Sequence, residues 1–565
     1  MTIEQLLVVA REHQQAGRVA DAAEAFNQLG VALDGAGRIE DSRRAFAHAV
    51  ALVPTTVTAL TNLARANFLL GRLNEALPAA QAAVQHGPQS AMAWVALATI
   101  LSRLNRPAEA ADAYRSAIRL RPDNPDAHCN LGNALKDQGY IADAIAAYRA
   151  ALAVDPDHRS AWSNLLLALH FDPTSTGESI LAEHRAWAKV QADPFTHATV
   201  DFSNDRSPDR RLRIGYVSPD FRRHAVGAFM LPLLANHDRA AFEIFCYADV
   251  HQPDAMTNRL RVHADTWRFT ATLTDEAVAE QIRADEIDIL VDLALHSDGN
   301  RMLTFARKPA PVLASYLGYP STTGLRAMDW RLTDRLLDDP ARDGRFYSEH
   351  AAYLETTYWC YSEPIASAMI SNPPMLAHEH ITFGCVNNFG KVSDAALAAW
   401  AEILTQLPDS RLILHVQPGP HRQRALNACG DRVTFVQRQS LAKYFEQYNA
   451  IDIALDPFPY CGATTTLDAL WMGVPVVSLA GETAVQRAGL SILSRIGLAD
   501  LVAGDIDNYI GRAVELAGQR ERIAELRRTL RQRMRASPLM DAAAFARDVE
   551  RLYRMMWSTW VQRTG

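Results

Sequence analysis

Cysteine is scarce in this sequence, with six residues in 565, at positions far apart. No CxxC pair and no metal-ligand spacing occurs, which excludes the disulfide framework of a small secreted domain and the usual pattern of a zinc site. Residues 1–12 hold only a very short apolar run between Glu4 and Arg11, which argues against a signal peptide or a membrane span. We therefore expect a cytoplasmic protein with reduced thiols and no membrane partner.

An excess of positive charge is also missing, because the formal net charge is −7 at pH 7. This argues against a nucleic-acid partner, and the arginine-rich stretch at 519–535 is interpreted as the solvated face of a helix. Neither a GxxxxGK[ST] nor a GxGxxG loop is present. The acidic pair Asp505 and Asp507 could chelate Mg²⁺, but its position after Gly504 favours a helix N-cap. We therefore predict a site without a metal or another cofactor.

What the chain does have is a repeat with a period of 34 residues. This spacing is typical of tetratricopeptide helix pairs, in which a proline follows the second helix and small residues such as Gly132 let helices approach closely. Arrays of this kind form concave surfaces that hold polypeptide. We predict an all-α repeat array over residues 1–170. The positions that keep the period are Pro54, Pro88, Pro122 and Pro156, and Gly37, Gly71 and Gly139 with Asn105 in the gap.

After Arg211 the pattern changes to short apolar segments that alternate with amphipathic helices, as in a parallel sheet covered by helices. We predict a linker at 171–208, two Rossmann-like halves at 209–372 and 373–540, and a last helix at 541–565. Two doubly wound halves of similar size predict a ligand in a cleft at the carboxyl ends of their strands. Strands are expected at 212–217, 243–247, 287–293, 312–316 and 330–332, and then at 381–385, 411–415, 433–436, 453–455 and 475–478.

The first predicted strand runs into a loop with Asp220 and His224, a carboxylate and an imidazole four residues apart. Such a pair can take a proton from a hydroxyl or orient a substrate that loses one. The alternative is a helix-start aspartate with an ordinary exposed histidine.

Two loops of the second half carry groups suited to a diphosphate. Lys391 ends the loop after 381–385, where a compact cation can neutralise phosphate oxygens. After 453–455, Gly462 can take a positive φ, and Thr464 and Thr465 can start a helix whose free N–H groups and hydroxyls bind an anion. Asp468, one turn further, could accept hydrogen bonds from ribose hydroxyls. The alternative is a plain threonine-capped helix.

Taken together, these segments resemble the O-linked N-acetylglucosaminyltransferase family, intracellular enzymes that glycosylate Ser and Thr of proteins. The resemblance covers nearly the whole chain, and its sharpest pieces are the segment from Asp220 to His224 and the Thr-Thr-x-x-Asp segment. The motifs that carry it are the repeat array and residues 213–221, 317–320, 464–471, 481–483 and 552–557.

This resemblance implies a GT-B fold and an inverting, metal-independent transfer from UDP-N-acetylglucosamine, in which charge on the leaving diphosphate must be stabilised. It implies that Lys391 is the cation at the diphosphate, that Thr464 and Thr465 donate to it, and that Asn388 contacts the diphosphate or the sugar. It implies that Asp468 binds ribose. Further donor contacts are implied at Gly318, Pro320, Gln439 and Gly462, and at Tyr444, whose ring would stack on uracil.

The resemblance also implies that His224 and Asp220 lie beside the sugar, as candidates for the base or for acceptor orientation. His170, at the end of the repeats, matches an active-site histidine of the family loosely. The protein acceptor is expected along the groove of the repeats.

Several positions depart from the animal members of the family. Gly390 replaces a tyrosine, Ala463 replaces a histidine, and Leu441 replaces a lysine of the uridine site, with Lys443 nearby as a substitute. Plant members transfer fucose from a guanine nucleotide, so GDP-fucose remains an alternative donor. A peptide-binding scaffold without activity is a second alternative, which the retained site residues argue against.

Overall fold

The computed structural model describes residues 1–196, 201–366 and 368–564. The chain forms two compact units, of which the first comprises residues 1–161 with 417–422 and the second the other residues from 162 onward. The prediction of an all-α repeat array followed by two parallel α/β halves is confirmed.

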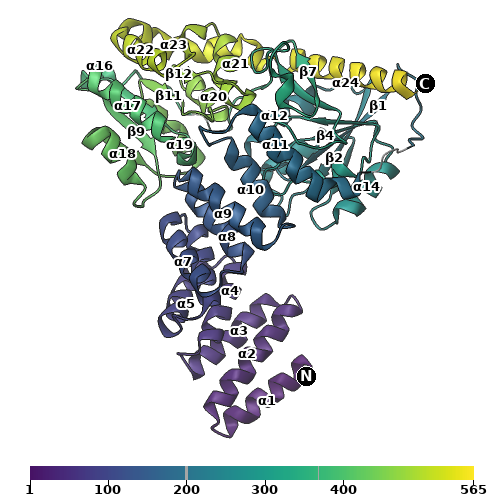
Figure 1. Ribbon diagram of the computed structural model, residues 1–565, viewed down its shortest axis with the longest axis vertical. Helices are drawn as coiled ribbons and strands as arrows, with labels where there is room; N and C mark the ends of the chain where they lie inside the picture. Colours follow the sequence, from purple (N-terminus) through teal and green to yellow (C-terminus); the bar gives the residue numbers. More distant parts are fainter. Residues whose placement is uncertain (197–200, 367, 565) are drawn as a thin grey trace. The chain divides into compact units, whose positions relative to one another are not determined.

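The first unit is built of antiparallel helix pairs, drawn in purple and blue in Figure 1. Each pair packs against the next, as the 34-residue period predicts. The helix α10 begins in this unit and ends in the second. The helices are α1 (Ile3–Gln15), α2 (Val19–Gly35), α3 (Ile39–Leu52), α4 (Val57–Leu69), α5 (Leu73–His86), α6 (Ala91–Arg103), α7 (Pro107–Leu120), α8 (Pro125–Asp137), α9 (Ile141–Val154) and α10 (Arg159–Leu169).

The turns of the repeats use the residues that their backbone conformation demands. Gly71 and Gly139 have φ of 73° and 79°, and Asn105 takes the same place with φ of 56°. Asparagine is the side chain that tolerates this left-handed conformation best, so it substitutes for glycine there. The predicted proline stops are confirmed, because α9 ends two residues before Pro156.

The second unit contains two parallel sheets. The first has the strand order β3-β2-β1-β4-β5-β6-β7 and the second the order β10-β9-β8-β11-β12-β13. All pairings are parallel, and each sheet reverses its direction of growth at one place, between β1 and β4 and between β8 and β11. Ligands of doubly wound sheets bind at such switch points, outside the carboxyl ends of the strands.

Most strands lie where the sequence predicts them, and the bounds of β9, β10 and β11 are exactly as expected. Three were missed: β3 is a half-exposed edge strand, β7 carries two alanines, and β13 has only two residues. The strands are β1 (Leu212–Ser218), β2 (Phe242–Ala248), β3 (Thr266–Phe269), β4 (Ile289–Asp292), β5 (Val312–Ser315), β6 (Trp330–Asp334), β7 (His350–Leu354), β8 (Thr382–Cys385), β9 (Arg411–His415), β10 (Val433–Val436), β11 (Ile453–Leu455), β12 (Val476–Leu479) and β13 (Val502–Ala503).

The stretch 171–208, predicted as a linker, holds a capped helix whose His184 and Trp187 are buried in the second unit. Residues 197–200 of this stretch lie outside the described residues. The helices of the second unit are α11 (Gly177–Trp187), α12 (Ala225–Asn236), α13 (Ala255–Arg261), α14 (Asp275–Ala284), α15 (Met302–Ala306), α16 (Met375–His378), α17 (Asp394–Gln406), α18 (Arg422–Cys429), α19 (Leu441–Gln447), α20 (Thr464–Trp471), α21 (Ala488–Ser494), α22 (Ile506–Gly518), α23 (Arg520–Arg535) and α24 (Ala542–Thr564).

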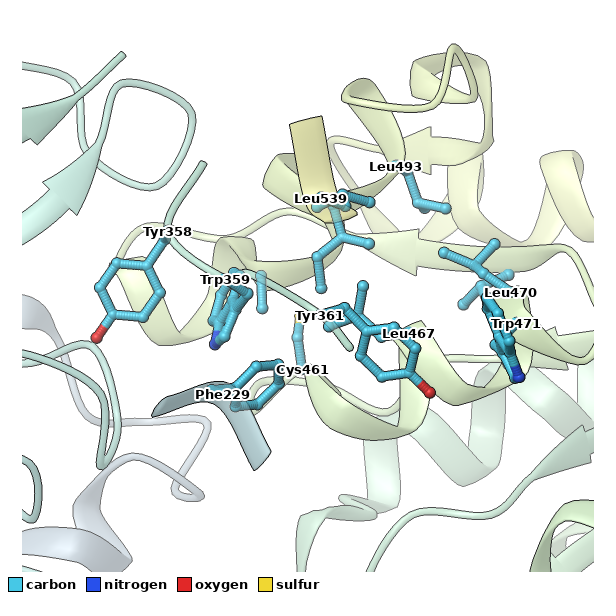
Figure 2. Close-up of a cluster of buried hydrophobic side chains, with 14 of the residues drawn as sticks. Phe229, Tyr358, Trp359, Tyr361, Cys461, Leu467, Leu470, Trp471, Leu493 and Leu539 are labelled. Atoms are coloured by element: carbon cyan, nitrogen blue, oxygen red, sulfur yellow. The ribbon is translucent and has the colours of Figure 1, made fainter. Parts of the chain in front are cut away.

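One hydrophobic core runs through both halves of the second unit. Figure 2 shows part of it, where Trp359 of the segment that joins the halves lies beside Phe229 of α12, and Tyr361 of the same segment lies beside Leu467 of α20. The last helix, α24, returns to the first half and packs along α12 and β7 (Figure 1). There the hydroxyl of Tyr553 lies 3.0 Å from that of Tyr216. The two halves are therefore held together by a common hydrophobic core as well as by the connecting segment.

The arginine-rich helix α23 corrects the prediction of a solvated face. Arg527 is only 2% exposed, and its guanidinium donates to the carbonyls of Tyr448, Ile451 and Met472. Burial lowers its pKa to about 10. Sequence periodicity missed this role because an arginine that satisfies buried carbonyls looks the same in sequence as a solvated one.

We expect Arg527→Met to lower the free energy of unfolding by about 3 kcal/mol, because three buried carbonyls lose a charged donor. Arg528→Met is the matched control, since its exposed side chain donates only to Ala524 of the same helix. Urea denaturation followed by circular dichroism measures both. Equal midpoints for the two variants would contradict the structural role of Arg527.

Candidate functional site

The predicted site residues lie on loops that follow the strands at the two switch points. The loop after β1 carries Asp220 and His224, and the loop after β8 carries Asn388 and Lys391. The loop after β11 leads into α20. The topology thus collects these residues at the carboxyl ends of the central strands, as predicted.

Lys391 supplies the positive charge of the site. It ends the short turn η4 (Phe389–Lys391), and its Nζ donates to the carbonyl of Cys461 at 3.2 Å and lies 4.0 Å from the centre of the Tyr460 ring. Among the described residues no carboxylate lies within 4.0 Å of this ammonium. Burial lowers the pKa of Lys391 to about 8, although the charge of Asp456 opposes the shift. A half-buried cation with no ion-pair partner is suited to an anionic ligand.

The helix α20 begins beside this cation. It starts at Thr464, as predicted, but its N-cap is Ala463 and no side chain caps it. Thr465 instead donates its hydroxyl to Asn387 at 2.7 Å, and Thr466 donates to the carbonyl of Gly462 at 3.0 Å. The alternative of a threonine-capped helix is therefore wrong. The first N–H groups of α20 are left for an anion.

Gly462 is required for a reason other than the predicted one. It does not adopt a positive φ; instead a Cβ atom there would lie 2.5 Å from Oγ1 of Thr465 and 2.9 Å from Oδ1 of Asp456. The N–H of Gly462 donates to Asp456 at 2.7 Å, and Ser478 donates to the other carboxylate oxygen. Burial raises the pKa of Asp456 to about 6, while its hydrogen bonds and Lys391 lower it.

Sequence reasoning gave no role to Asp456, Asn387 and Tyr460. Asp456 fixes the loop that leads into α20, Asn387 holds Thr465, and Tyr460 lies under Lys391. Asp456 had a usable signal, because it follows the buried strand β11 directly. Asn387 had a weaker signal of the same kind, because it lies in the loop after β8, and Tyr460 had none.

Asp220 and His224 lie together, as predicted. Nδ1 of His224 is 3.4 Å from Oδ2 of Asp220, and the same nitrogen accepts the N–H of Val226 at 3.3 Å, so His224 also caps α12. Asp220 is buried, and its carboxylate accepts from Arg222. Burial lowers the pKa of His224, with Asp220 opposing the shift. Nδ1 cannot accept from Val226 and carry a proton at the same time. In the tautomer that carries Nδ1–H, this hydrogen faces Asp220 in place of the Val226 contact, and Nε2 of the partly exposed ring can accept a proton.

His170 is enclosed. It is only 3% exposed and neither of its ring nitrogens has a hydrogen-bond partner, while its ring centre lies 5.1 Å from that of Tyr319. Burial lowers its pKa to about 3, so the ring is neutral at pH 7. The next residue, Phe171, stacks on Tyr460 at 4.8 Å. Both ring nitrogens of His170 are therefore buried in this structure and are not accessible to a substrate.

Asp468 and Tyr444 lie together one turn into α20. Asp468 is 6% exposed and accepts from the hydroxyls of Tyr361 at 2.6 Å and Tyr444 at 2.9 Å. Burial raises the pKa of Asp468 to about 6, and the two tyrosine hydroxyls lower it. The hydroxyl of Tyr444 thus donates to Asp468, and this hydrogen bond leaves the faces of its ring available for other contacts.

The remaining predicted residues are spread more widely. Asn388 is exposed and accepts the N–H of Gly390 at 3.0 Å. Gly318, with φ of 59°, and Pro320 lie on the loop after β5, where a Cβ atom at Gly318 would lie 2.7 Å from the carbonyl oxygen of Ala294. Gln439 is exposed after β10.

Two further expectations can be compared with the described residues. Asp505 caps α22 by accepting the N–H of Asn508, as predicted. No cluster of three His, Cys, Asp or Glu side chains among residues 1–196, 201–366 and 368–564 has the geometry to hold a metal ion. In the same part of the chain, every helix is too short or too polar to cross a lipid bilayer.

Comparison with known proteins fits this geometry. The profile of glycosyl transferase family 41 matches residues 171–365 and 366–549, which is more than half of the chain. The chain belongs to this family. Tetratricopeptide-repeat profiles match residues 27–91, 100–139 and 125–158. The resemblance to O-linked N-acetylglucosaminyltransferases expected from the sequence is thereby confirmed.

Two curated relatives and one solved structure are similar. The probable UDP-N-acetylglucosamine–peptide N-acetylglucosaminyltransferase SPINDLY of Solanum lycopersicum is 36% identical over 69% of this chain and 43% of that protein. The protein named SEC of Arabidopsis thaliana, with the same printed activity, is 29% identical over 65% of this chain and 39% of its own length. The chain thus spans less than half the length of these relatives. A lysine-to-methionine mutant of the Thermobaculum terrenum O-GlcNAc transferase has a TM-score of 0.83 and 35% identity, covering 91% of this chain and 99% of that one.

The isolated charge of Lys391 predicts that Lys391→Met stabilises the ligand-free protein. The folded-state pKa of about 8 lies below the ordinary value of 10.5, so the protonated form is disfavoured on folding. This cost is fully present below pH 8 and is relieved as the pH rises to 10.5. We expect a gain in the free energy of unfolding of about 1–3 kcal/mol at pH 7 that disappears near pH 10.5.

Urea denaturation at pH 7 and pH 10 measures this difference. Lys443→Met is the control, because Lys443 is an exposed lysine on α19 and its removal should change neither value. Equal stability of wild type and Lys391→Met at pH 7 would show that the cation carries no burial cost.

Proposed function

We propose that this protein is a glycosyltransferase that moves N-acetylglucosamine from UDP-N-acetylglucosamine to Ser and Thr hydroxyls of proteins. The observation that carries the proposal is the ammonium of Lys391, without an ion pair, beside the uncapped start of α20. A diphosphate brings two or more negative charges to a place where a cation and free N–H groups converge. The family and the printed names of the similar proteins support the same activity.

The reaction is a single displacement with inversion at the anomeric carbon. The acceptor oxygen forms a bond to that carbon while the bond from the carbon to the diphosphate oxygen breaks, and its electron pair leaves with the diphosphate. Lys391 and the N–H groups of α20 stabilise this growing charge. We propose that Lys391 takes the part that a divalent metal ion plays in other sugar transferases, so no metal is needed.

Asp220 and His224 are proposed to act on the acceptor. The acceptor proton leaves as the new bond forms, and Nε2 of His224 accepts it. This requires the tautomer in which Nδ1–H points to Asp220, 3.4 Å away, rather than the one in which Nδ1 accepts from Val226. Because the pKa of His224 is lowered by burial, the imidazole is neutral near pH 7 and able to take a proton.

The repeat unit is proposed to bind the protein acceptor. A hollow of about 350 Å³ lies between α4 and α6 and is lined by Asn62, Phe68, Met92 and Val95. Polar amides beside apolar side chains suit an extended polypeptide, whose backbone and side chains need both kinds of contact.

GDP-fucose is the second candidate donor. The observation that favours it is Leu441, an exposed leucine at the start of α19 where the resemblance places a lysine of the uridine site. Without that cation, the base site has lost one contact suited to uracil. The nucleotide that stabilises the fold will decide between the two donors.

We expect UDP to raise the melting temperature and GDP to leave it unchanged. A nucleotide at about 100 times its Kd stabilises the fold by about 2.7 kcal/mol. Lys391→Ala should abolish the shift, whereas Lys189→Ala, at an exposed lysine just after α11, should keep it. Differential scanning fluorimetry measures wild type and both variants with each of the two nucleotides. A shift with GDP alone would assign the donor to the guanine series, and an undiminished shift in Lys391→Ala would remove the lysine from the diphosphate site.

Transfer itself is tested with UDP-N-acetylglucosamine or GDP-fucose and a peptide library, read by mass spectrometry. Mass added to Ser or Thr with the first donor supports the proposal. Nucleotide binding without any transfer would favour the inactive scaffold.

The affinity for UDP should fall at alkaline pH. The diphosphate binds the protonated form of Lys391, whose pKa in the free protein is about 8. We expect Kd to be nearly constant up to about pH 7, to double by about pH 8, and to rise by up to about tenfold per pH unit above that. The phosphate oxygens are already ionised in this range, since their second pKa is about 6.

Isothermal titration calorimetry from pH 7 to 9.5 measures how the Kd for UDP changes with pH. Lys391→Arg serves as the comparison, because its guanidinium stays charged throughout and should give a flat profile. A fall in affinity of the same size in this variant would assign the pH dependence to another group.

A further inference from the structure

The carboxylate of Asp468 connects two parts of the second unit that are distant in sequence. Asp468 belongs to α20, and Tyr361, whose hydroxyl donates to Oδ1 at 2.6 Å, belongs to the segment that joins the two sheets. The main-chain N–H of Tyr361 is held by the carbonyl of Leu539. The hydroxyl of Tyr444 donates to Oδ2 at 2.9 Å. Each carboxylate oxygen therefore accepts one tyrosine hydroxyl.

The ring of Tyr361 is fixed by packing. Its centre lies 6.1 Å from the Trp471 ring, and Figure 2 shows it beside Leu467, with Leu539 above. The side chain is only 6% exposed. A tyrosine held on its ring faces presents its hydroxyl in one direction only, and here that direction is Asp468.

The two tyrosine hydrogen bonds leave part of the carboxylate able to accept further hydrogen bonds. An ionised carboxylate has about four lone-pair sites, two on each oxygen. One site on each oxygen is used by a tyrosine, so one on each remains. Two acceptors on adjacent oxygens match the two neighbouring hydroxyls of a ribose, which is the group that the nucleotide of the proposed donor would bring.

This capacity exists only while Asp468 is ionised. Among the described residues no Lys, Arg or His nitrogen lies within 4.0 Å of its carboxylate. The titratable groups that face it are Tyr361, Tyr444 of α19 and Tyr448 of η6 (Tyr448–Ala450), while Arg531 of α23 acts on Tyr361. Neutral hydroxyls alone therefore hold this buried charge.

We propose that Tyr361 is a positioning residue of the nucleotide site, whose hydroxyl keeps Asp468 ionised and oriented to accept the two ribose hydroxyls. The proposal rests on the proposed function, because it assigns the nucleotide to α20. The proposal adds Tyr361, from the segment that joins the two sheets, to the residues of the site. Ribose binding would therefore depend on the contact between that segment and α20.

The test compares Tyr361→Phe with Tyr358→Phe. Tyr358 lies on the same segment and is also buried, but its hydroxyl contacts the backbone of Leu317 rather than Asp468. Calorimetric titrations with UDP and GDP, and with 2′-deoxy-UDP and 2′-deoxy-GDP, are run from pH 5.5 to 8. The ratio of variant to wild-type Kd is used, because the titration of the nucleotide itself cancels in it.

The pKa of Asp468, already raised to about 6 by burial, should rise further by about one unit when the Tyr361 hydroxyl is removed. We expect Tyr361→Phe to weaken binding of the ribonucleotide about fivefold near pH 6 and progressively less toward pH 8. Its preference for the ribonucleotide over the 2′-deoxy form should fall at pH 6. Tyr358→Phe should match wild type throughout.

A loss in Tyr361→Phe that is the same at every pH, or an unchanged ribose preference, would overturn the proposal and leave Tyr361 a packing residue. Should Tyr361→Phe fail to fold, Tyr444→Phe removes the other hydroxyl and should give the same pH-dependent loss; a flat profile there would also overturn it. If wild type binds neither UDP nor GDP, the proposed function itself fails, which is a separate and recognisable result.

Discussion

The site depends on one charge that the fold keeps without a counter-ion. The ammonium of Lys391 touches an aromatic face and a backbone carbonyl, and among the described residues no carboxylate, Asp456 included, lies within ion-pair distance of it. A partner carboxylate would stabilise the free protein but would compete with any anionic ligand. The unpaired cation therefore lowers the free energy of unfolding of the ligand-free protein, and binding of an anion would restore it. Asp456, Gly462 and Tyr460 hold the geometry in which this is possible.

The positions of these residues follow from the strand order. In each sheet, the chain first builds in one direction from the central strand and then crosses to the other side, so the loops after β1, β4, β8 and β11 have no helix crossing above them. Polar groups that would be costly elsewhere are tolerated at these places because a ligand can satisfy them. Asp220, His224 and Lys391 all lie there.

Much of the fold could be predicted because its signals are local. A proline two residues after α9 and the glycine or asparagine turns fix the repeats, and continuous apolar runs fix β9, β10 and β11. The edge strand β3 and the two-residue β13 escaped because they lack such runs. Arg527 was misinterpreted because its partners are three carbonyls from two other segments, Tyr448 and Ile451 in one and Met472 in the other, which no sequence pattern marks.

The site was predicted in the same uneven way. Lys391, Thr464, Asp220 and His224 stand directly after predicted strands, where a polar residue is informative. The reason for Gly462 was wrong, because a close approach to Thr465 and Asp456 cannot be distinguished in sequence from a left-handed turn. The environments of His170 and Tyr361 depend on long-range packing: one is enclosed without hydrogen bonds and the other meets a helix more than a hundred residues away.

Burial lowers the pKa of the lysine in this region and raises the pKa of the two aspartates, and both changes favour the neutral forms. It lowers the pKa of Lys391 to about 8 and raises the pKa of Asp456 and Asp468 to about 6, so each group is held nearer to its neutral form than it would be in water. Near pH 7 all three still favour their charged forms, but by a small margin. A nucleotide diphosphate would favour the charged lysine through its phosphates and the charged Asp468 through its ribose hydroxyls. Binding would then raise the pKa of Lys391 and lower the pKa of Asp468, so that both groups become fully charged in the complex. The diphosphate and the ribose, which do not depend on the base, would thus be recognised by groups that are fully ionised only when the ligand is bound.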